Sequence, residues 1–308
     1  MRHPDIRRDF LQTFVPRAPL IVNAALALVY FTVLTFFFPV GNPVLFALLI
    51  FGEVFHLWQV LTFLFTIWNT SSPPSANPDF TPAVDVFIPV AGEPAELVER
   101  TVSAALRMDY PSFTIYLLND GYVAGKENWM DIEDLAQRQG VHCITRTVPG
   151  GAKAGNINNA LSQTSGEVIA IFDCDHIPHR DFLRKTAGYF KDPRMGFVQT
   201  PQFYRNFAHN YVTMSSWEQQ EIFFGPICRG KNRLNAVTMC GTNMLVSRRA
   251  FLRVGGMNQD SIAEDFITGL LMHKAGFRSV YVPEVLAAGL ATEDLRTYAK
   301  QQFRWARG

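Results

Sequence analysis

Two long apolar stretches stand near the start of the chain. No charged residue occurs from Ala18 to Val40, and Glu53 and His56 are the only ionisable residues from Val44 to Trp68. Each stretch exceeds the roughly 20 residues that an α-helix needs to cross a bilayer. The first stretch is too long for a signal peptide, and a second follows it directly. We therefore predict a two-helix transmembrane hairpin over residues 18–68, the alternative being two buried helices of a soluble protein.

The charges around these stretches predict their orientation. Arg2, Arg7, Arg8 and Arg17 precede the first stretch, whereas the turn between the two carries neither lysine nor arginine. Positive flanks usually stay in the cytosol, and two crossings return the chain to the same side. Residues 1–17 and everything after the hairpin are therefore expected in the cytosol. Within the second span, Glu53 and His56 are expected to face protein or a polar cavity, or to snorkel toward the cytosolic surface.

The polar part begins with a linker and continues with alternating strand and helix patterns. Residues 69–82, NTSSPPSANPDFTP, are rich in proline, serine and asparagine. The expected strands are Val84–Val90, Thr114–Leu118, Val141–Arg146 and Glu167–Phe172; the expected helices are Pro94–Met108, Trp129–Gln139 and one that begins over Lys153–Leu161. This alternation predicts an α/β fold with a mostly parallel sheet over residues 83–308. Ligands of such sheets bind beyond the carboxyl ends of the strands.

Composition excludes some classes of function. The 308 residues carry a net charge of +1, so no concentrated basic surface for nucleic acid is expected. The four cysteines are scattered, without the paired spacing of a zinc site or a disulfide framework. This usage fits a reducing, cytosolic environment for the polar part.

The sharpest chemical signal is a pair of acids at the end of an apolar strand. Val168–Phe172 reads as a buried strand, and Asp173 and Asp175 follow one residue apart. Two carboxylates this close repel each other, and a hard divalent cation such as Mg²⁺ or Mn²⁺ would relieve the repulsion. His176 either adds a ligand or packs. A solvated acidic turn fits poorly with the apolar strand before it.

Four further motifs each allow a structural and a functional interpretation. Asp120 ends a strand before Gly121, where Asp-Gly is also a common turn. Lys153 lies between glycines and a helix start, which favours phosphate, although the Walker spacing is absent. Asp265, beside Glu264, is either a general base or a complement to the helix dipole over Ser261–Phe277. The helical pattern of residues 297–308, with its aromatic and basic side chains, suits a membrane surface or a carbohydrate or phosphate site.

Taken in order, these motifs resemble the cellulose synthase type of processive glycosyltransferase of glycosyltransferase family 2. The resemblance runs from about Val84 to Gly308, and the ordered set is far more specific than any single motif. It implies a membrane-embedded, inverting enzyme with a GT-A domain that binds a nucleotide sugar. Because that family continues into further membrane helices, the end at Gly308 is expected to reflect a truncated chain or a fragment, with those helices or accessory subunits supplied elsewhere.

For the donor, the resemblance implies one role for each matching residue. Asp120 contacts the nucleoside, and Lys153 lies near the uridine diphosphate. Asp173, with Asp175, holds the diphosphate and the divalent metal, Mg²⁺ or Mn²⁺. Gln301 and Arg304, in the QQFRW box, bind the diphosphate.

For the acceptor, the resemblance implies that Asp265 is the catalytic base. Cys240, Glu264 and Trp305 contact the acceptor sugar, and the VQTPQ stretch, Val198–Gln202, lines the site. A second acidic tripeptide, Thr292-Glu293-Asp294, lies too close to the QQFRW box for the family order. We interpret it as a helix start, with Thr292 as the N-cap and the acids in the first turn.

Two positions depart from the family pattern. Asn119 stands where the family often has an aspartate, and Ala263 replaces the usual threonine. Neither change removes a group that is assigned catalytic work.

The resemblance implies that this chain transfers a hexose, with glucose favoured, from a UDP-sugar to a growing β-linked polysaccharide at the inner (plasma) membrane. The chain would be a multi-pass protein whose partners are the donor, the polysaccharide acceptor and the lipid bilayer. The alternatives are a synthase that uses UDP-GlcNAc, a non-processive glycolipid transferase, or a protein that binds nucleotide sugar without turnover. A Rossmann dehydrogenase is a weak alternative, since no G-x-G-x-x-G follows the first strand.

Overall fold

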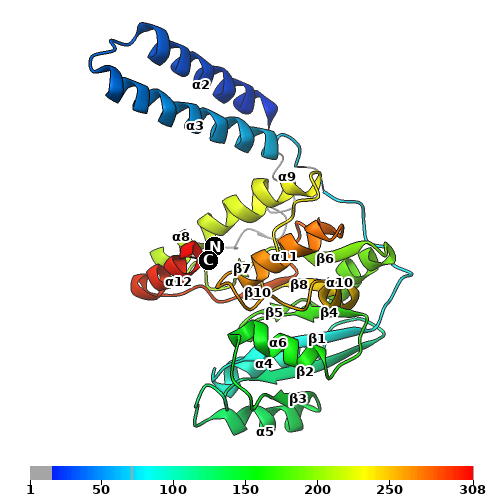
Figure 1. Cartoon of the computed structure of the whole chain (residues 1–308). Coiled ribbons are helices and arrows are strands. Elements are labelled where there is room, and N and C mark those ends of the chain that lie inside the picture. Colours follow the sequence, from blue (N-terminus) through cyan, green and yellow to red (C-terminus); the bar gives the residue numbers. More distant parts are fainter. Residues whose placement is uncertain (1–15, 71, 308) are drawn as a thin grey trace.

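A computed structural model describes residues 16–70 and 72–307 and shows a two-helix hairpin that projects from an α/β domain (Figure 1). The hairpin helices are α2 (Arg17–Phe37) and α3 (Pro43–Ile67). Both are long and apolar enough to cross a bilayer, as expected from the sequence. Asn42 starts α3, because its side-chain oxygen accepts hydrogen bonds from two backbone N–H groups of the first turn. Glu53 faces the other helix, where the Tyr30 hydroxyl donates to it at 3.3 Å.

A seven-stranded sheet forms the centre of the domain. In spatial order its strands are β3 (His142–Thr145), β2 (Phe113–Asn119), β1 (Val84–Val90), β4 (Val168–Ile171), β8 (Met244–Ser247), β6 (Met195–Gln199) and β9 (Arg278–Tyr281). Only β8 runs antiparallel to its neighbours β4 and β6. The predicted mostly parallel sheet is therefore confirmed, and the four predicted strands lie within one residue of their expected bounds.

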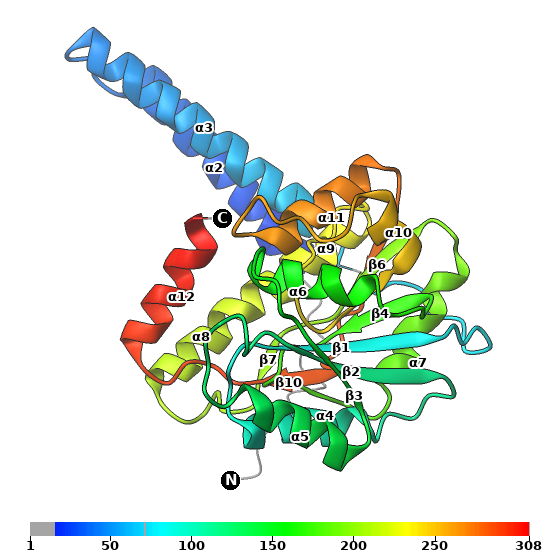
Figure 2. The same ribbon diagram turned by 60° about the horizontal axis from the view of Figure 1, so that its bottom comes forward.

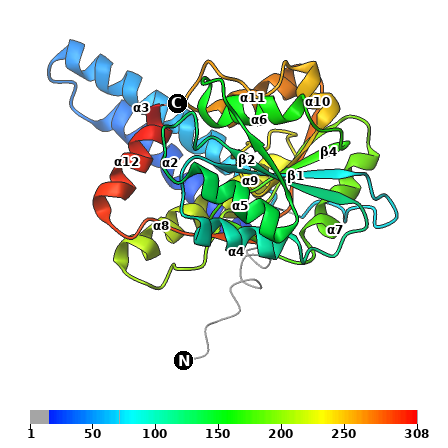
Figure 3. The same cartoon turned by 90° about the horizontal axis from the view of Figure 1, so that it is seen from below.

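Helices cover both faces of this sheet, which explains the uninterrupted apolar strands. Val86 and Ile88 pack on one side with α4 (Ala95–Ala105), α5 (Trp129–Gln139) and α7 (Phe182–Thr186), whereas Phe87 packs on the other with α6 (Ala152–Leu161), α10 (Arg248–Arg253) and α11 (Glu264–Lys274) (Figure 3). The 3-10 helix η1 (Ala187–Lys191) follows α7. Helix α4 ends three residues before the predicted Met108, because the chain tightens there into i→i+3 turns.

A small second sheet lies beside the acidic turn. Its strands are β5 (Ile177–Pro178), β10 (Ala287–Gly289) and β7 (Phe203–Tyr204), in that spatial order. It begins two residues after Asp175, so the chain that follows the acids is held in place immediately.

The base of the hairpin packs tightly on the domain. A kinked run consists of α8 (Tyr211–Ile222), the π-helix η2 (Phe223–Ile227), which contains Pro226, and α9 (Cys228–Asn232). A side chain at Gly230 would collide with the carbonyl oxygen of Thr66 at the end of α3. Next to this contact, the Arg233 guanidinium lies 4.4 Å from the centre of the Phe65 ring. Glycine at position 230 therefore permits direct contact between α9 and α3.

The predicted linker has no helix or strand in its described residues, yet it is fastened to the domain. The Tyr189 hydroxyl donates to the Pro74 carbonyl at 2.7 Å, and the Tyr110 hydroxyl donates to the Pro82 carbonyl at 2.8 Å. The linker thus follows the surface of the domain.

The last helix, α12 (Leu295–Arg307), lies alongside α8 (Figure 2). The expectation that Thr292 is its N-cap is wrong, since Asp294 accepts the Thr297 N–H at 2.9 Å and no acid lies in the first turn. The helix starts later than expected because Asn206 and Asn210 bind the backbone of residues 291 and 293 and hold it out of helical geometry.

Candidate active site

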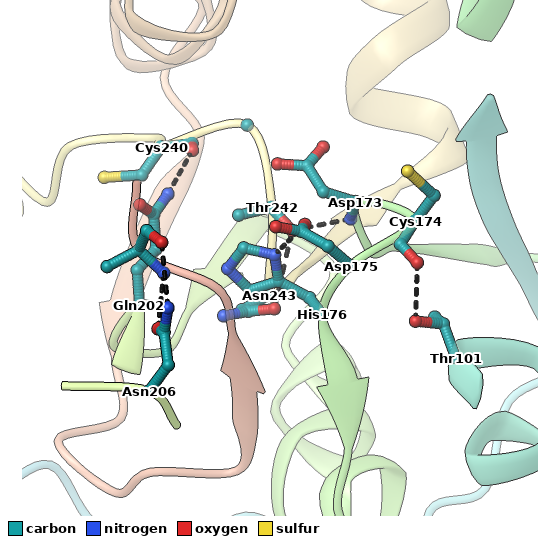
Figure 4. A network of polar contacts seen from close by, with 12 residues as sticks. Thr101, Asp173, Cys174, Asp175, His176, Gln202, Asn206, Cys240, Thr242 and Asn243 are labelled. Carbon is teal, nitrogen blue, oxygen red and sulfur yellow. Dashed lines mark hydrogen bonds and ion pairs between the residues drawn. The ribbon is translucent and has the colours of Figure 1, made fainter. Parts of the chain in front are cut away.

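The two acids after β4 form a cluster with the next histidine. Ligand atoms of Asp173, Asp175 and His176 all lie within 4.8 Å of one another (Figure 4). The His176 Nδ1 is 2.8 Å from an Asp175 carboxylate oxygen. Burial, the largest single effect, favours the neutral form of Asp175, but the hydrogen bond and charge of His176 and two backbone hydrogen bonds together outweigh it and lower the pKa of Asp175. The carboxylate therefore stays charged and is suited to a hard divalent cation.

The second ring nitrogen of His176, Nε2, is also available to bind a metal ion. His176 is buried, and its Nε2 has no hydrogen-bond partner among the described residues. With Nδ1–H donated to Asp175, Nε2 is left as a lone-pair donor, which suits a metal ion. A side chain at Gly289 would collide with the imidazole ring, so glycine makes room for it. The three residues together fit a divalent cation.

Lys153 reaches the cluster from the start of α6. The turn before it is left-handed at Gly151, with φ 65°, and a side chain at Gly155 would collide with the Gly150 carbonyl. The Lys153 ammonium donates to the Asp173 carboxylate and, at 2.9 Å, to the Gly241 carbonyl. Burial acts to lower the pKa of Lys153, but the carboxylates around it prevail and raise it. A positive charge is thus held beside the acids.

Asp265 stands across from Lys153, in the first turn of α11. One carboxylate oxygen accepts the Phe266 N–H at 2.7 Å, and the other lies against Gly241, where a Cβ would approach it to 2.8 Å. Burial is the main cause that raises the pKa of Asp265, and the neighbouring Asp173 adds to it. Burial likewise raises the pKa of Glu264, with Asp265 as a second cause. A partly buried carboxylate with a raised pKa has the properties of a general base.

Asp120 is not free, because Arg146 binds both of its oxygens. The two nitrogens Nε and Nη2 of Arg146 lie 2.8 and 2.6 Å from the carboxylate, and both side chains are buried. Arg146 also donates to the carbonyls of Gly150 and Ala152 in the turn before Lys153. It therefore connects the predicted nucleoside acid with the predicted phosphate turn.

Arg146 is a site residue that the sequence analysis missed. A signal was present, since Arg146 ends a predicted strand just as Asp120 does, and adjacent parallel strands end at the same edge of a sheet. Only the register between β2 and β3, unknown from sequence, shows that the two side chains face each other.

Replacing Arg146 with methionine is expected to destabilise the fold by about 3 kcal/mol, because it leaves the buried Asp120 carboxylate unpaired. The loss is measured as a lower melting temperature of the full chain in detergent. Arg194→Met is the matched control, since Arg194 pairs with Asp192 on the exposed surface and should change little. Equal melting temperatures for both variants would contradict the structural importance of the Arg146–Asp120 pair.

Cys240 belongs to a loop, Cys240–Asn243, that lies between the acids and β6. Its carbonyl accepts from Gln202 at 2.9 Å, and its N–H donates to Gln199 at 2.9 Å. The thiol points away from Asp173 and Asp175 (Figure 4) and contacts the Thr238 carbonyl at 3.5 Å. The backbone of Cys240 therefore anchors the loop to Gln199 and Gln202, whereas its thiol contacts neither acid.

Asn119 has a structural part that accounts for one departure from the family pattern. Its side chain accepts the Gly121 N–H at 2.9 Å and donates to the Trp129 carbonyl at 2.8 Å. These bonds fix the turn that presents Asp120. An uncharged amide supplies both a donor and an acceptor here, which a carboxylate does not.

The QQFRW box on α12 lies apart from the acids. Arg304 and Trp305 are exposed, and neither side chain makes a hydrogen bond or an ion pair with another described residue. Arg304 nevertheless lies near enough to act on Glu264, whose pKa it lowers against the larger effect of burial. Gln301 is half-buried. The roles predicted for these three residues stay predictions.

Comparisons with known proteins show the family and the fold of this chain. Residues 82–308 match the family described as "Glycosyltransferase like family 2". The chain is 38% identical over 259 residues to a cellulose synthase catalytic subunit [UDP-forming] of Xanthomonas axonopodis pv. citri, covering 81% of this chain and 35% of that protein. It is 35% identical over 274 residues to the corresponding subunit of Komagataeibacter xylinus, covering 84% of this chain and 36% of that protein. The chain thus spans about a third of the length of these relatives.

A solved structure has the same fold. A mannosyltransferase from Pyrobaculum calidifontis, in complex with GDP-Man and Mn²⁺, matches with a TM-score of 0.61 and 20% identity, covering 80% of this chain and 68% of that one. The expected GT-A type of α/β fold is thereby confirmed. Because the family match covers most of the chain and includes every acid of the site, the chain belongs to glycosyltransferase family 2.

Proposed function

We propose that this chain is the catalytic part of an inverting transferase that moves glucose from UDP-glucose to the end of a β-linked glucan. The observation that carries the proposal is the arrangement around Gly241, where Lys153 donates to its carbonyl and to Asp173, and where a Cβ would come within 2.8 Å of an Asp265 carboxylate oxygen. A cation, a metal-binding acid and a base thus converge on one loop. The likeness to cellulose synthase catalytic subunits supports the choice of donor and product.

The donor side of the reaction requires that charge on the leaving diphosphate be neutralised. Asp173, Asp175 and His176 would hold Mg²⁺ or Mn²⁺, which would supply Lewis-acid stabilisation of the diphosphate. Lys153 adds a positive charge that its surroundings keep protonated at neutral pH. Asp120, held by Arg146 at the end of β2 and separated from β4 by β1, would contact the nucleoside.

The acceptor side requires a base on the opposite side of the anomeric carbon. Asp265 removes the proton from the acceptor hydroxyl as the new bond forms, so that a single displacement inverts the anomeric centre. Trp305 offers a flat apolar face to the terminal acceptor sugar, and Gln301 and Arg304 reach the diphosphate, as the family resemblance implies. In this proposal α2 and α3 cross the inner membrane, and the α/β domain faces the cytosol beside the bilayer.

Donor turnover tests this proposal. The full chain in detergent or nanodiscs is expected to hydrolyse UDP-glucose slowly in the presence of Mn²⁺, faster than UDP-GlcNAc or GDP-mannose, and to stop when EDTA is added. Sizing of products made with a β-glucan oligosaccharide would separate processive extension from single transfer. Preference for UDP-GlcNAc, transfer to lipid only, or binding of UDP-glucose without any turnover would each contradict the proposal.

A further inference from the structure

The backbone of the acidic turn is held by threonine hydroxyls from both sides. The Asp173 N–H donates to the Thr242 Oγ1 at 2.8 Å, and the Thr101 Oγ1 donates to the Cys174 carbonyl at 2.7 Å (Figure 4). The two threonines come from different parts of the chain, Thr101 from α4 and Thr242 from the Cys240–Asn243 loop. Both are almost fully buried, with exposed fractions of 0% and 1%. Each hydroxyl is therefore committed to the turn and shielded from water.

The Thr242 hydroxyl is itself fixed in place. The backbone carbonyl of Thr242 accepts from the buried Gln199 side chain at 2.8 Å, and the Thr242 hydroxyl donates to the Asn243 side-chain oxygen at 3.4 Å. Asn243 holds a left-handed φ of 53°, a conformation that costs energy outside glycine and that surrounding hydrogen bonds maintain. Asn243 also donates to the Pro201 carbonyl at 3.2 Å. Hydrogen bonds within the protein thus hold this loop.

The same loop also locates the two other charged groups of the site. The Gly241 carbonyl accepts from Lys153, and the Gly241 α-carbon lies against Asp265. Gly241 has a φ of 74°, so only glycine meets both the backbone shape and the close approach of Asp265. Two neighbouring residues of this loop, Gly241 and Thr242, therefore contact all three charged residues of the site, which are Asp173, Lys153 and Asp265.

We propose that Thr242 and Thr101 are positioning residues that fix the Asp173–Asp175 turn in the geometry needed for a divalent cation. They act through the backbone of the turn and do not touch substrate. The inference rests on the proposed function for the identity of the site. Partners of this kind typically change metal affinity by 10- to 100-fold when they are removed.

Thr242→Val tests the proposal, because valine keeps the shape of threonine and removes the hydroxyl. Binding of Mn²⁺ by the full chain is followed by electron paramagnetic resonance of the free ion, with and without UDP, so the readout does not depend on turnover. We expect the Mn²⁺ dissociation constant to rise about tenfold or more in Thr242→Val and in Thr101→Val. Thr242→Ser and Thr101→Ser, which retain the hydroxyl, should bind within about twofold of the unsubstituted chain. In donor hydrolysis, the valine variants should need more Mn²⁺ for half-maximal rate, with a smaller loss at saturating Mn²⁺.

Thr186→Val is the matched control. Thr186 is also fully buried and donates to a backbone carbonyl, at 2.6 Å, but it lies in α7, outside the site. Its Mn²⁺ affinity should be unchanged. If Thr242→Val fails to fold, as judged by its melting temperature, the Mn²⁺ affinity of Thr101→Val tests the proposal, because Thr101 binds the same turn at the Cys174 carbonyl.

Unchanged Mn²⁺ affinity in folded valine variants would overturn the inference, as would serine variants that bind as weakly as the valine ones. The latter outcome would assign the effect to packing of the methyl group. If the unsubstituted chain bound no Mn²⁺ at all, both the proposed function and this inference would be wrong. If it bound Mn²⁺ and the valine variants bound it equally well, only this inference would be wrong.

Discussion

Replacing Asp265 with asparagine is expected to lower the rate of sugar transfer by about a thousandfold while leaving the affinity for UDP within about twofold. Asparagine keeps the size of the side chain and its hydrogen bond with the Phe266 N–H, but it cannot accept the acceptor's proton. Transfer is measured with radiolabelled UDP-glucose and a β-glucan acceptor, and UDP binding by calorimetry in the presence of Mn²⁺.

Asp294→Asn is the matched control for this substitution. Asp294 also follows a glutamate, but it caps α12 at an exposed position, so its loss should leave the chemistry intact. Transfer at the normal rate by Asp265→Asn, or an equal loss in Asp294→Asn, would remove Asp265 from the role of base.

The pH profile of transfer gives an independent reading of the same residue. Because burial raises the pKa of Asp265, the carboxylate gains its proton at a higher pH than an ordinary aspartate. The base is active only when unprotonated, so activity should be full above this raised pKa and fall as the pH drops through it. The acid limb of kcat should therefore lie at a higher pH than the pKa of an ordinary aspartate, and a limb at the usual aspartate value would count against Asp265 as base.

Replacing Asp173 or Asp175 with alanine is expected to abolish the Mn²⁺-dependent part of UDP binding, a loss of at least a hundredfold in affinity. Each change removes a hard oxygen ligand and leaves a single carboxylate with His176 to hold a cation that also binds the diphosphate. In Asp173→Ala the Lys153 ammonium also loses its carboxylate partner and keeps only the Gly241 carbonyl. Calorimetry with UDP, with Mn²⁺ and then with EDTA, separates the metal-dependent part from the rest.

Asp192→Ala is the control for general charge effects. Asp192 pairs with Arg194 and Arg278 on the exposed surface, remote from the metal cluster. Its UDP affinity should be unchanged. Mn²⁺-dependent binding that survives in both Asp173→Ala and Asp175→Ala would place the metal elsewhere and remove the basis of the proposed mechanism.

Much of the fold could be predicted because its strands are buried on both faces. Such strands read as apolar runs that end abruptly, and Asp120 and Asp173 stand just after two of them. Parallel strands end at one edge of the sheet, so residues far apart in sequence meet there without any knowledge of side-chain contacts. This reasoning predicts that Asp120 and Asp173 lie at the same edge of the sheet, and the parallel pairing of β2, β1 and β4 confirms it.

What escaped prediction depends on register and on partners far along the chain. The four-residue strand β8 inserts antiparallel between β4 and β6, and no turn motif announces it. The pairing of Arg146 with Asp120, 26 residues apart in the chain, depends on how β2 and β3 are aligned. Asp294 rather than Thr292 caps α12 because Asn206, 85 residues before Ala291, holds the preceding backbone. None of these contacts leaves a periodic signature.

The bare contact of Gly230 with the end of α3 sets a mechanical limit on the enzyme. Because the backbones of α9 and α3 touch at Gly230, the hairpin and the domain are joined by a direct contact as well as by the linker of residues 69–82. Extra residues inserted there would bulge outward and would not raise the domain from the bilayer. In the proposed arrangement, each sugar is therefore added at a constant height above the lipid, so the distance a nascent chain travels to reach the membrane is built into the helices themselves.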